Sequence, residues 1–162
     1  MNQRLQEAVA CLNSRSGEAV QEAILLIGEA AFFSRSGIKS DVLPAANDER
    51  LEGRDMQVLR QTLIDFVEGD PFGPEAGSAI WALSKFRDRA MVETYRGWLR
   101  RYVEHPSRSA VAVGQLVASL SNLGEDVITD GSFSAVEVGK NFDDAVAYLR
   151  RQSAGDAEGP RK

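Results

Sequence analysis

The chain has 162 residues, of which 43% are apolar, 27% charged and 7% aromatic, and its formal net charge is −5. This composition excludes a disordered chain, and 14 glycines and 5 prolines are too few for a fibrous or low-complexity protein. No stretch approaches the roughly 20 apolar residues of a membrane-spanning helix, and the first residues lack the pattern of a signal peptide. The sequence therefore predicts a globular cytoplasmic protein with no membrane partner.

Apolar residues recur at helical spacing along most of the chain. This spacing predicts seven helices: one ending near residue 14, one over 18–34, one over about 56–68, one from 74 to about 86, one after an Asp88 cap, one over about 110–123, and one from an Asn141 cap to about Arg151. Residues 35–50 form a long predicted loop, and residues 153–162 are predicted to be a disordered tail. The fold class is all-α, with a single helical domain over residues 1–152.

One segment, residues 126–136, breaks the helical pattern. Two short runs that suit strands flank Asp130 and Gly131, a pair that favours a tight hairpin turn. An irregular loop accommodates the same residues equally well, because an isolated hairpin has little stability of its own. The segment is therefore predicted to be either a small β-hairpin or an irregular loop.

A degenerate repeat with an offset of 37 residues relates segment 82–91 to segment 119–128. Both copies have apolar residues at their second, fifth, ninth and tenth positions, share Leu-Ser, and have an acidic residue just after the helix end. At these residues, within about 74–128, the chain resembles HEAT-type helical repeats. The resemblance implies stacked antiparallel helix pairs, an α-solenoid fragment, whose surface binds another macromolecule and rarely catalyses a reaction.

The sequence lacks the residue sets of the common catalytic and metal sites. Cys11 and His105 are the only cysteine and histidine, so neither a zinc site nor a disulfide within the chain is expected. Gly139 and Lys140 form the one Gly-Lys pair, but the other key positions of a phosphate-binding loop do not match. The chain is therefore predicted not to be an enzyme and to need no cofactor or metal.

Charge is segregated along the chain. Residues 41–75 hold nine acids and three bases, residues 85–108 seven bases and three acids, and residues 120–149 six acids and one base. Two sets of residues are predicted to bind a partner. They are an aromatic and basic strip on the fifth helix and an acidic cluster after the sixth: Arg96, Trp98, Arg100 and Arg101, and Glu125, Asp126 and Asp130. Packing of Trp98 against a neighbouring repeat is the structural alternative.

These observations favour a non-catalytic protein that binds another protein. By analogy alone, small acidic helical proteins of this size resemble bacterial immunity proteins, and the partner would then be a basic toxin. An alternative is a nucleic-acid-binding, DNA-repair-like HEAT protein that uses the basic strip, although the acidic total disfavours nucleic acid. An adaptor or effector chaperone is a further alternative.

Overall fold

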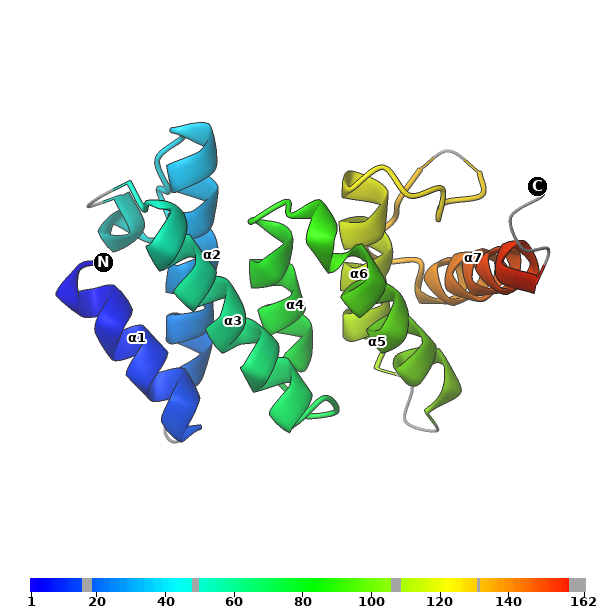
Figure 1. Ribbon diagram of the computed structural model, residues 1–162, viewed down its shortest axis with the longest axis horizontal. Coiled ribbons are helices and arrows are strands. Elements are labelled where there is room, and N and C mark those ends of the chain that lie inside the picture. Colours follow the sequence, from blue (N-terminus) through cyan, green and yellow to red (C-terminus); the bar gives the residue numbers. More distant parts are fainter. Residues whose placement is uncertain (16–18, 48–49, 106–108, 131, 158–162) are drawn as a thin grey trace. The chain divides into compact units, whose positions relative to one another are not determined.

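The computed structural model describes residues 1–15, 19–47, 50–105, 109–130 and 132–157. Within these ranges the chain forms seven α-helices and no β-strand, which confirms the predicted all-α class (Figure 1). The chain divides into two compact units, Met1–Arg87 and Asp88–Lys162. Among the described residues, no helix is both long enough and apolar enough to cross a bilayer.

The first unit contains α1 (Gln3–Ser14), α2 (Val20–Ser36), the short 3₁₀ helix η1 (Pro44–Asn47), α3 (Gly53–Gly69) and α4 (Ala76–Ser84). Helix α2 packs against α1 and α4, and α3 packs against α1 and α4. Their apolar stripes form a core that includes Ile24, Ile27, Leu59, Leu63 and Ile80. The predicted loop over residues 35–50 includes η1, which is held by hydrogen bonds between Ser40 and Asn47.

The second unit contains η2 (Arg89–Met91), α5 (Val92–Glu104), α6 (Ala110–Asn122) and α7 (Val138–Ala157). The three α-helices pack against one another around Tyr95, Leu99, Leu116, Leu120 and Tyr148. The carboxylate of Asp88 accepts a hydrogen bond of 2.9 Å from the backbone N of Ala90, so it caps η2, which leads into α5, and not α5 itself, whose N-cap is Met91. Each residue of this core comes from a predicted helix, so the apolar spacing located the core correctly.

Helix α7 differs from its prediction at both ends. It begins at Val138, and the backbone N of Asn141 donates to the carbonyl of Glu137, so Asn141 lies inside the helix and the predicted cap is wrong. The Asn141 side chain instead donates to the carbonyl of Ser134. The helix continues to Ala157, where a disordered tail from residue 153 was predicted, and residues 158–162 lie outside the described residues.

The irregular-loop alternative is correct for the segment between α6 and α7. Residues 126–130 and 132–136 contain no strand, so the hairpin alternative is wrong for these residues, and Gly131 of the expected turn lies outside the described part. The physical reason is that residues on both sides of the expected turn bond to α7. Thr129 bonds to Asp144, and the Ser132 carbonyl accepts from Lys140.

The two copies of the predicted repeat end their first helices with the same backbone turn. Arg87 and Gly124, which the 37-residue offset aligns, both have a left-handed φ, of 48° and 87°. Their backbone N atoms donate to the carbonyls of the aligned serines, Ser84 and Ser121, at 3.2 and 2.9 Å. The repeat in the sequence thus corresponds to a shared helix-terminating turn in each unit.

Because both positions have a left-handed φ, placing glycine at position 87 and arginine at position 124 should change the free energy of unfolding in opposite directions. Arg87→Gly should raise the free energy of unfolding by up to about 1 kcal/mol, because glycine adopts a left-handed φ without the strain that a Cβ causes. Gly124→Arg should lower the free energy of unfolding by about 1 kcal/mol or more for the same reason. Urea denaturation of both variants followed by circular dichroism measures the two changes, and changes of the same sign would contradict this account.

Candidate partner-binding loop

The segment between α6 and α7, residues 124–137, is called the acidic loop below. It contains four carboxylates and no basic residue: Glu125, Asp126, Asp130 and Glu137. Within the loop the side chain of Val127 is buried, whereas the side chains of Phe133 and Val136 are 39% and 86% exposed. The loop therefore presents apolar side chains to water within an acidic surface.

The first half of the acidic loop is tied to α5 and α7 by a polar cluster. One carboxylate oxygen of Glu125 lies 2.5 Å from Nη2 of Arg96 and accepts a hydrogen bond of 2.6 Å from the Tyr148 hydroxyl. Nε of Arg96 in turn donates to the Tyr148 hydroxyl at 2.6 Å. Because three elements meet in this cluster, its hydrogen bonds fix the point at which the loop leaves α6.

The cluster shifts the ionisation of its members. The hydrogen bond from Tyr148 and the guanidinium of Arg96 lower the pKa of Glu125 below its ordinary value, although partial burial opposes them. Burial and the neighbouring Glu125 raise the pKa of Tyr148 to about 12. At neutral pH the carboxylate and the guanidinium are therefore charged, and the phenol keeps its proton.

The second half of the acidic loop is tied to α7 through Asp144, which is 2% exposed. The Asp144 carboxylate accepts hydrogen bonds from the backbone N and the hydroxyl of Thr129 and pairs with Lys140 at 2.8 Å. Nζ of Lys140 also reaches Asp130 at 2.8 Å and the Ser132 carbonyl at 2.9 Å. One buried carboxylate and one lysine thus connect α7 to three positions of the loop.

The charges in this second cluster stabilise one another. Burial alone would raise the pKa of Asp144, but the hydrogen bonds from Lys140 and Thr129 outweigh it and hold the pKa below its ordinary value. The hydrogen bonds to Asp130 and Asp144 raise the pKa of Lys140. The pair is therefore ionised near neutral pH, when these hydrogen bonds are strongest.

Acid should weaken the folded state through Glu125 and Asp144. A carboxyl group whose folded pKa is lowered stabilises the fold above its unfolded pKa, and this stabilisation is lost as the pH falls through the folded pKa. We expect the free energy of unfolding to decrease as the pH falls below about 4.5, the ordinary pKa of a glutamate. Glu125→Gln should show a smaller decrease in urea titrations between neutral and acidic pH. An unchanged decrease in this variant would contradict the assigned role of Glu125.

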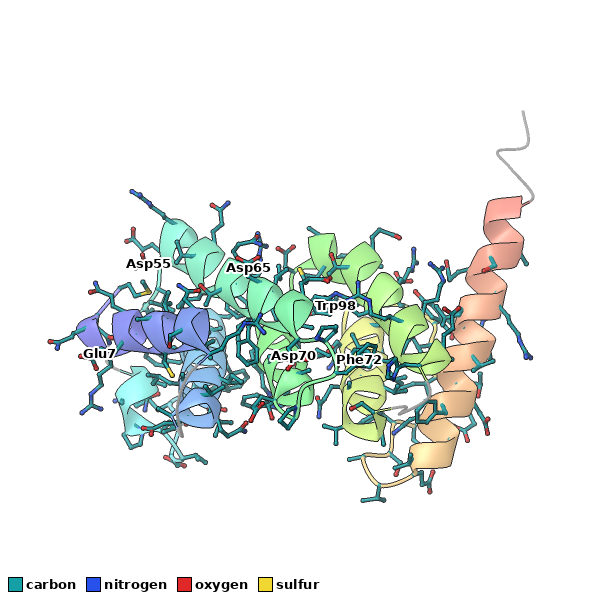
Figure 2. The ribbon with its side chains drawn as sticks, turned by 90° about the horizontal axis from the view of Figure 1, so that it is seen from below. Glu7, Asp55, Asp65, Asp70, Phe72 and Trp98 are labelled. Carbon is teal, nitrogen blue, oxygen red and sulfur yellow. The ribbon has the colours of Figure 1, made fainter. Side chains whose placement is uncertain are left out.

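The predicted partner-binding residues separate into different environments. Trp98, labelled in Figure 2, is 1% exposed, so its ring is not part of a surface strip. Arg96 and Glu125, predicted as separate contacts, bond to each other. Arg100 and Arg101 are exposed on α5, and Asp126 and Asp130 are exposed in the loop. Of the predicted residues, the structure brings the acidic ones together in one surface loop.

Several residues that shape this loop were missed by the sequence analysis. Asp144 and Lys140 are four residues apart, a spacing that favours an ion pair on a helix and could have been noticed. No local pattern indicated that Tyr148 would meet Arg96, which lies 52 residues earlier. The exposure of Phe133 and Val136 also had no signal, because both lie in a run that suited a strand packed on the helices.

Helices α1 and α3 of the first unit carry acidic and basic side chains in similar number. Figure 2 shows Glu7 on α1, Asp55 and Asp65 on α3, and Asp70 in the turn that follows α3. Asp55 pairs with the terminal amine of Met1. Among the described residues, no three histidine, cysteine, aspartate or glutamate side chains are arranged to hold a metal ion.

Comparisons with known proteins add no relative to this description. No family model, no curated protein and no solved structure matches the chain.

Proposed function

We propose that this protein acts by binding another protein, and that the acidic loop forms the centre of the contact. The observation that carries the proposal is the contrast within this loop. Side chains of α5 and α7 hold the loop in place, yet Val136 and Phe133 remain in water. A long loop that is tied to its neighbouring helices and exposes apolar side chains is typical of a binding surface, because burying them against a partner is favourable.

The charge around the loop supports a basic partner. Asp126 and Asp130 are exposed in the same loop as the apolar side chains, and the net charge of the whole chain is −5. Opposite charge on a partner speeds association and excludes acidic competitors. We therefore expect binding that weakens as salt concentration rises.

The specific function that we propose first is neutralisation of a basic toxin by direct binding. A toxin that acts on nucleic acid needs a basic surface, and an acidic protein could cover that surface. The proposed architecture of HEAT-like stacked helix pairs would supply a rigid support for the loop. An adaptor or effector chaperone would use the same contact with a different partner. The nucleic-acid alternative has less support, since the buried ring of Trp98 leaves no aromatic surface on α5 for a base to stack on.

The experiment is a binding assay against purified products of the genes that neighbour this one. Calorimetry at about 50 and 200 mM salt should detect one partner, with a dissociation constant that increases with salt. If that partner is a toxin, the purified chain should abolish its activity at equimolar concentration. A mobility-shift assay with DNA is the control. Retarded DNA together with no protein partner would contradict the proposal.

A further inference from the structure

The outer edge of α7 carries a partly exposed apolar stripe. Phe142, Val146 and Leu149 are half-buried and follow one another at spacings of four and three residues, which places them on one side of the helix. The adjacent face of α7, which includes Asn141 and Ala145, is buried against the rest of the second unit. The stripe is thus left at the edge of this unit.

A groove of about 330 Å³ extends the stripe between α5 and α7. Its apolar lining comes from Val103 of α5 and from Val146 and Leu149. Arg100 and Arg150 stand at its rim, and neither side chain makes a hydrogen bond or ion pair within the part of the chain described. Glu104 is the single carboxylate in the lining, so this end of α7 is basic.

Charges along the same edge of α7 have opposite signs at its two ends. Asp143 and Arg150 are seven residues apart, so both lie on one edge of the helix, next to the apolar stripe. Both are exposed, and Asp143, like Arg150, has no ion-pair partner within the described ranges. The edge therefore changes from acidic to basic in the direction of the C-terminus.

We propose that two copies of this chain form a dimer in which their α7 helices pack antiparallel about a two-fold axis near Val146. A two-fold axis places the same residues of both copies around it, so Val146 would contact its own counterpart. Phe142 would then lie opposite Leu149 of the second copy, at the mouth of its groove. Asp143 would lie beside Arg150 of the second copy, twice in each dimer.

A second copy fits this surface because the pattern is complementary to itself when the helix direction is reversed. Phe142 and Leu149 lie at nearly equal distances on either side of Val146, and so do Asp143 and Arg150. One antiparallel register therefore brings apolar residues opposite each other and each charge beside its opposite. An unrelated acidic partner would pair with Arg150 but would leave Asp143 facing like charge. The dimer surface is on α7, whereas the proposed contact of the acidic loop uses Phe133 and Val136.

Sedimentation velocity of the full chain at low salt tests the dimer. Wild-type protein should dimerise as its concentration increases, and Val146→Glu should remain monomeric. Val111→Glu is the matched control, because Val111 is an exposed valine on α6 and its substitution should leave the dimer unchanged. A wild-type chain that stays monomeric up to about 1 mM would overturn the proposal, as would a dimer that Val146→Glu leaves intact.

A charge exchange tests the register without relying on the apolar stripe. Asp143→Arg and Arg150→Glu should each raise the dissociation constant of the dimer at least about tenfold, because each places like charges together twice. An equimolar mixture of the two variants should dimerise as well as the wild type, since both pairs in the mixed dimer then have opposite charge. A mixture that stays as weak as the separate variants would overturn the antiparallel register.

Discussion

Replacing Asp144 by alanine should lower the free energy of unfolding by about 2–4 kcal/mol, the largest effect expected for a single polar side chain here. The carboxylate is almost fully buried, and it accepts two hydrogen bonds from Thr129 and pairs with Lys140. Its removal would leave the Thr129 hydroxyl and backbone N without their acceptor. Lys140 would lose this ion pair and keep the one with Asp130. The acidic loop would lose its attachment to the middle of α7.

Asp143→Ala is the matched control, because this carboxylate is the adjacent residue but is exposed. Its effect on the free energy of unfolding should stay within about 0.5 kcal/mol. Urea denaturation at neutral pH and low protein concentration measures both variants. Limited proteolysis should also cleave the loop faster in Asp144→Ala. Equal losses of stability in the two variants would contradict the anchoring role of Asp144.

Removing the exposed apolar side chains of the acidic loop should weaken partner binding without changing the stability of the fold. Phe133→Ser combined with Val136→Ser should raise the dissociation constant for the bound protein roughly 30-fold or more, because two side chains would no longer bury apolar surface on binding. Both side chains are exposed in the structure, so the free energy of unfolding should change little.

Val111→Ser provides the control for this loss of affinity. Val111 is 63% exposed on α6, outside the acidic loop, so its substitution removes comparable apolar surface from another part of the second unit. Calorimetry with the partner should give the wild-type affinity for this variant. An equal loss of affinity for Val111→Ser and for the double variant would show that the effect is not specific to the loop.

The helices could be predicted from the sequence because their determinants are local. Apolar spacing located all seven helices, and the Asp88 carboxylate capped the helical segment that follows it. The 37-residue offset also located two equivalent helix-terminating turns, at Arg87 and Gly124. Asn141 misled the prediction because its side chain bonds to the Ser134 carbonyl across the loop, which is a tertiary contact.

The candidate site was only partly predictable because pairing between residues far apart in the sequence decides which charged side chains can contact a partner. Arg96 and Glu125 each carried a reasonable signal for surface binding, but they are 29 residues apart and bond to each other once the helices pack. Trp98 lies beside the narrow stripe of Tyr95 and Leu99, yet α5 is buried over a wider arc that includes it. The acidic character of the loop was visible in the sequence, whereas its anchoring depended on tertiary contacts.

Site-specific photocrosslinking tests the central claim most directly. A photoreactive residue placed at Val136 in the acidic loop should crosslink the chain to its partner, and the same residue placed at Val111 on α6 should not. Mass spectrometry of the crosslinked product should identify a peptide of the partner. We expect basic residues next to the crosslinked position of that peptide. Crosslinks from position 111 together with none from position 136 would contradict the proposal that the acidic loop is the binding surface.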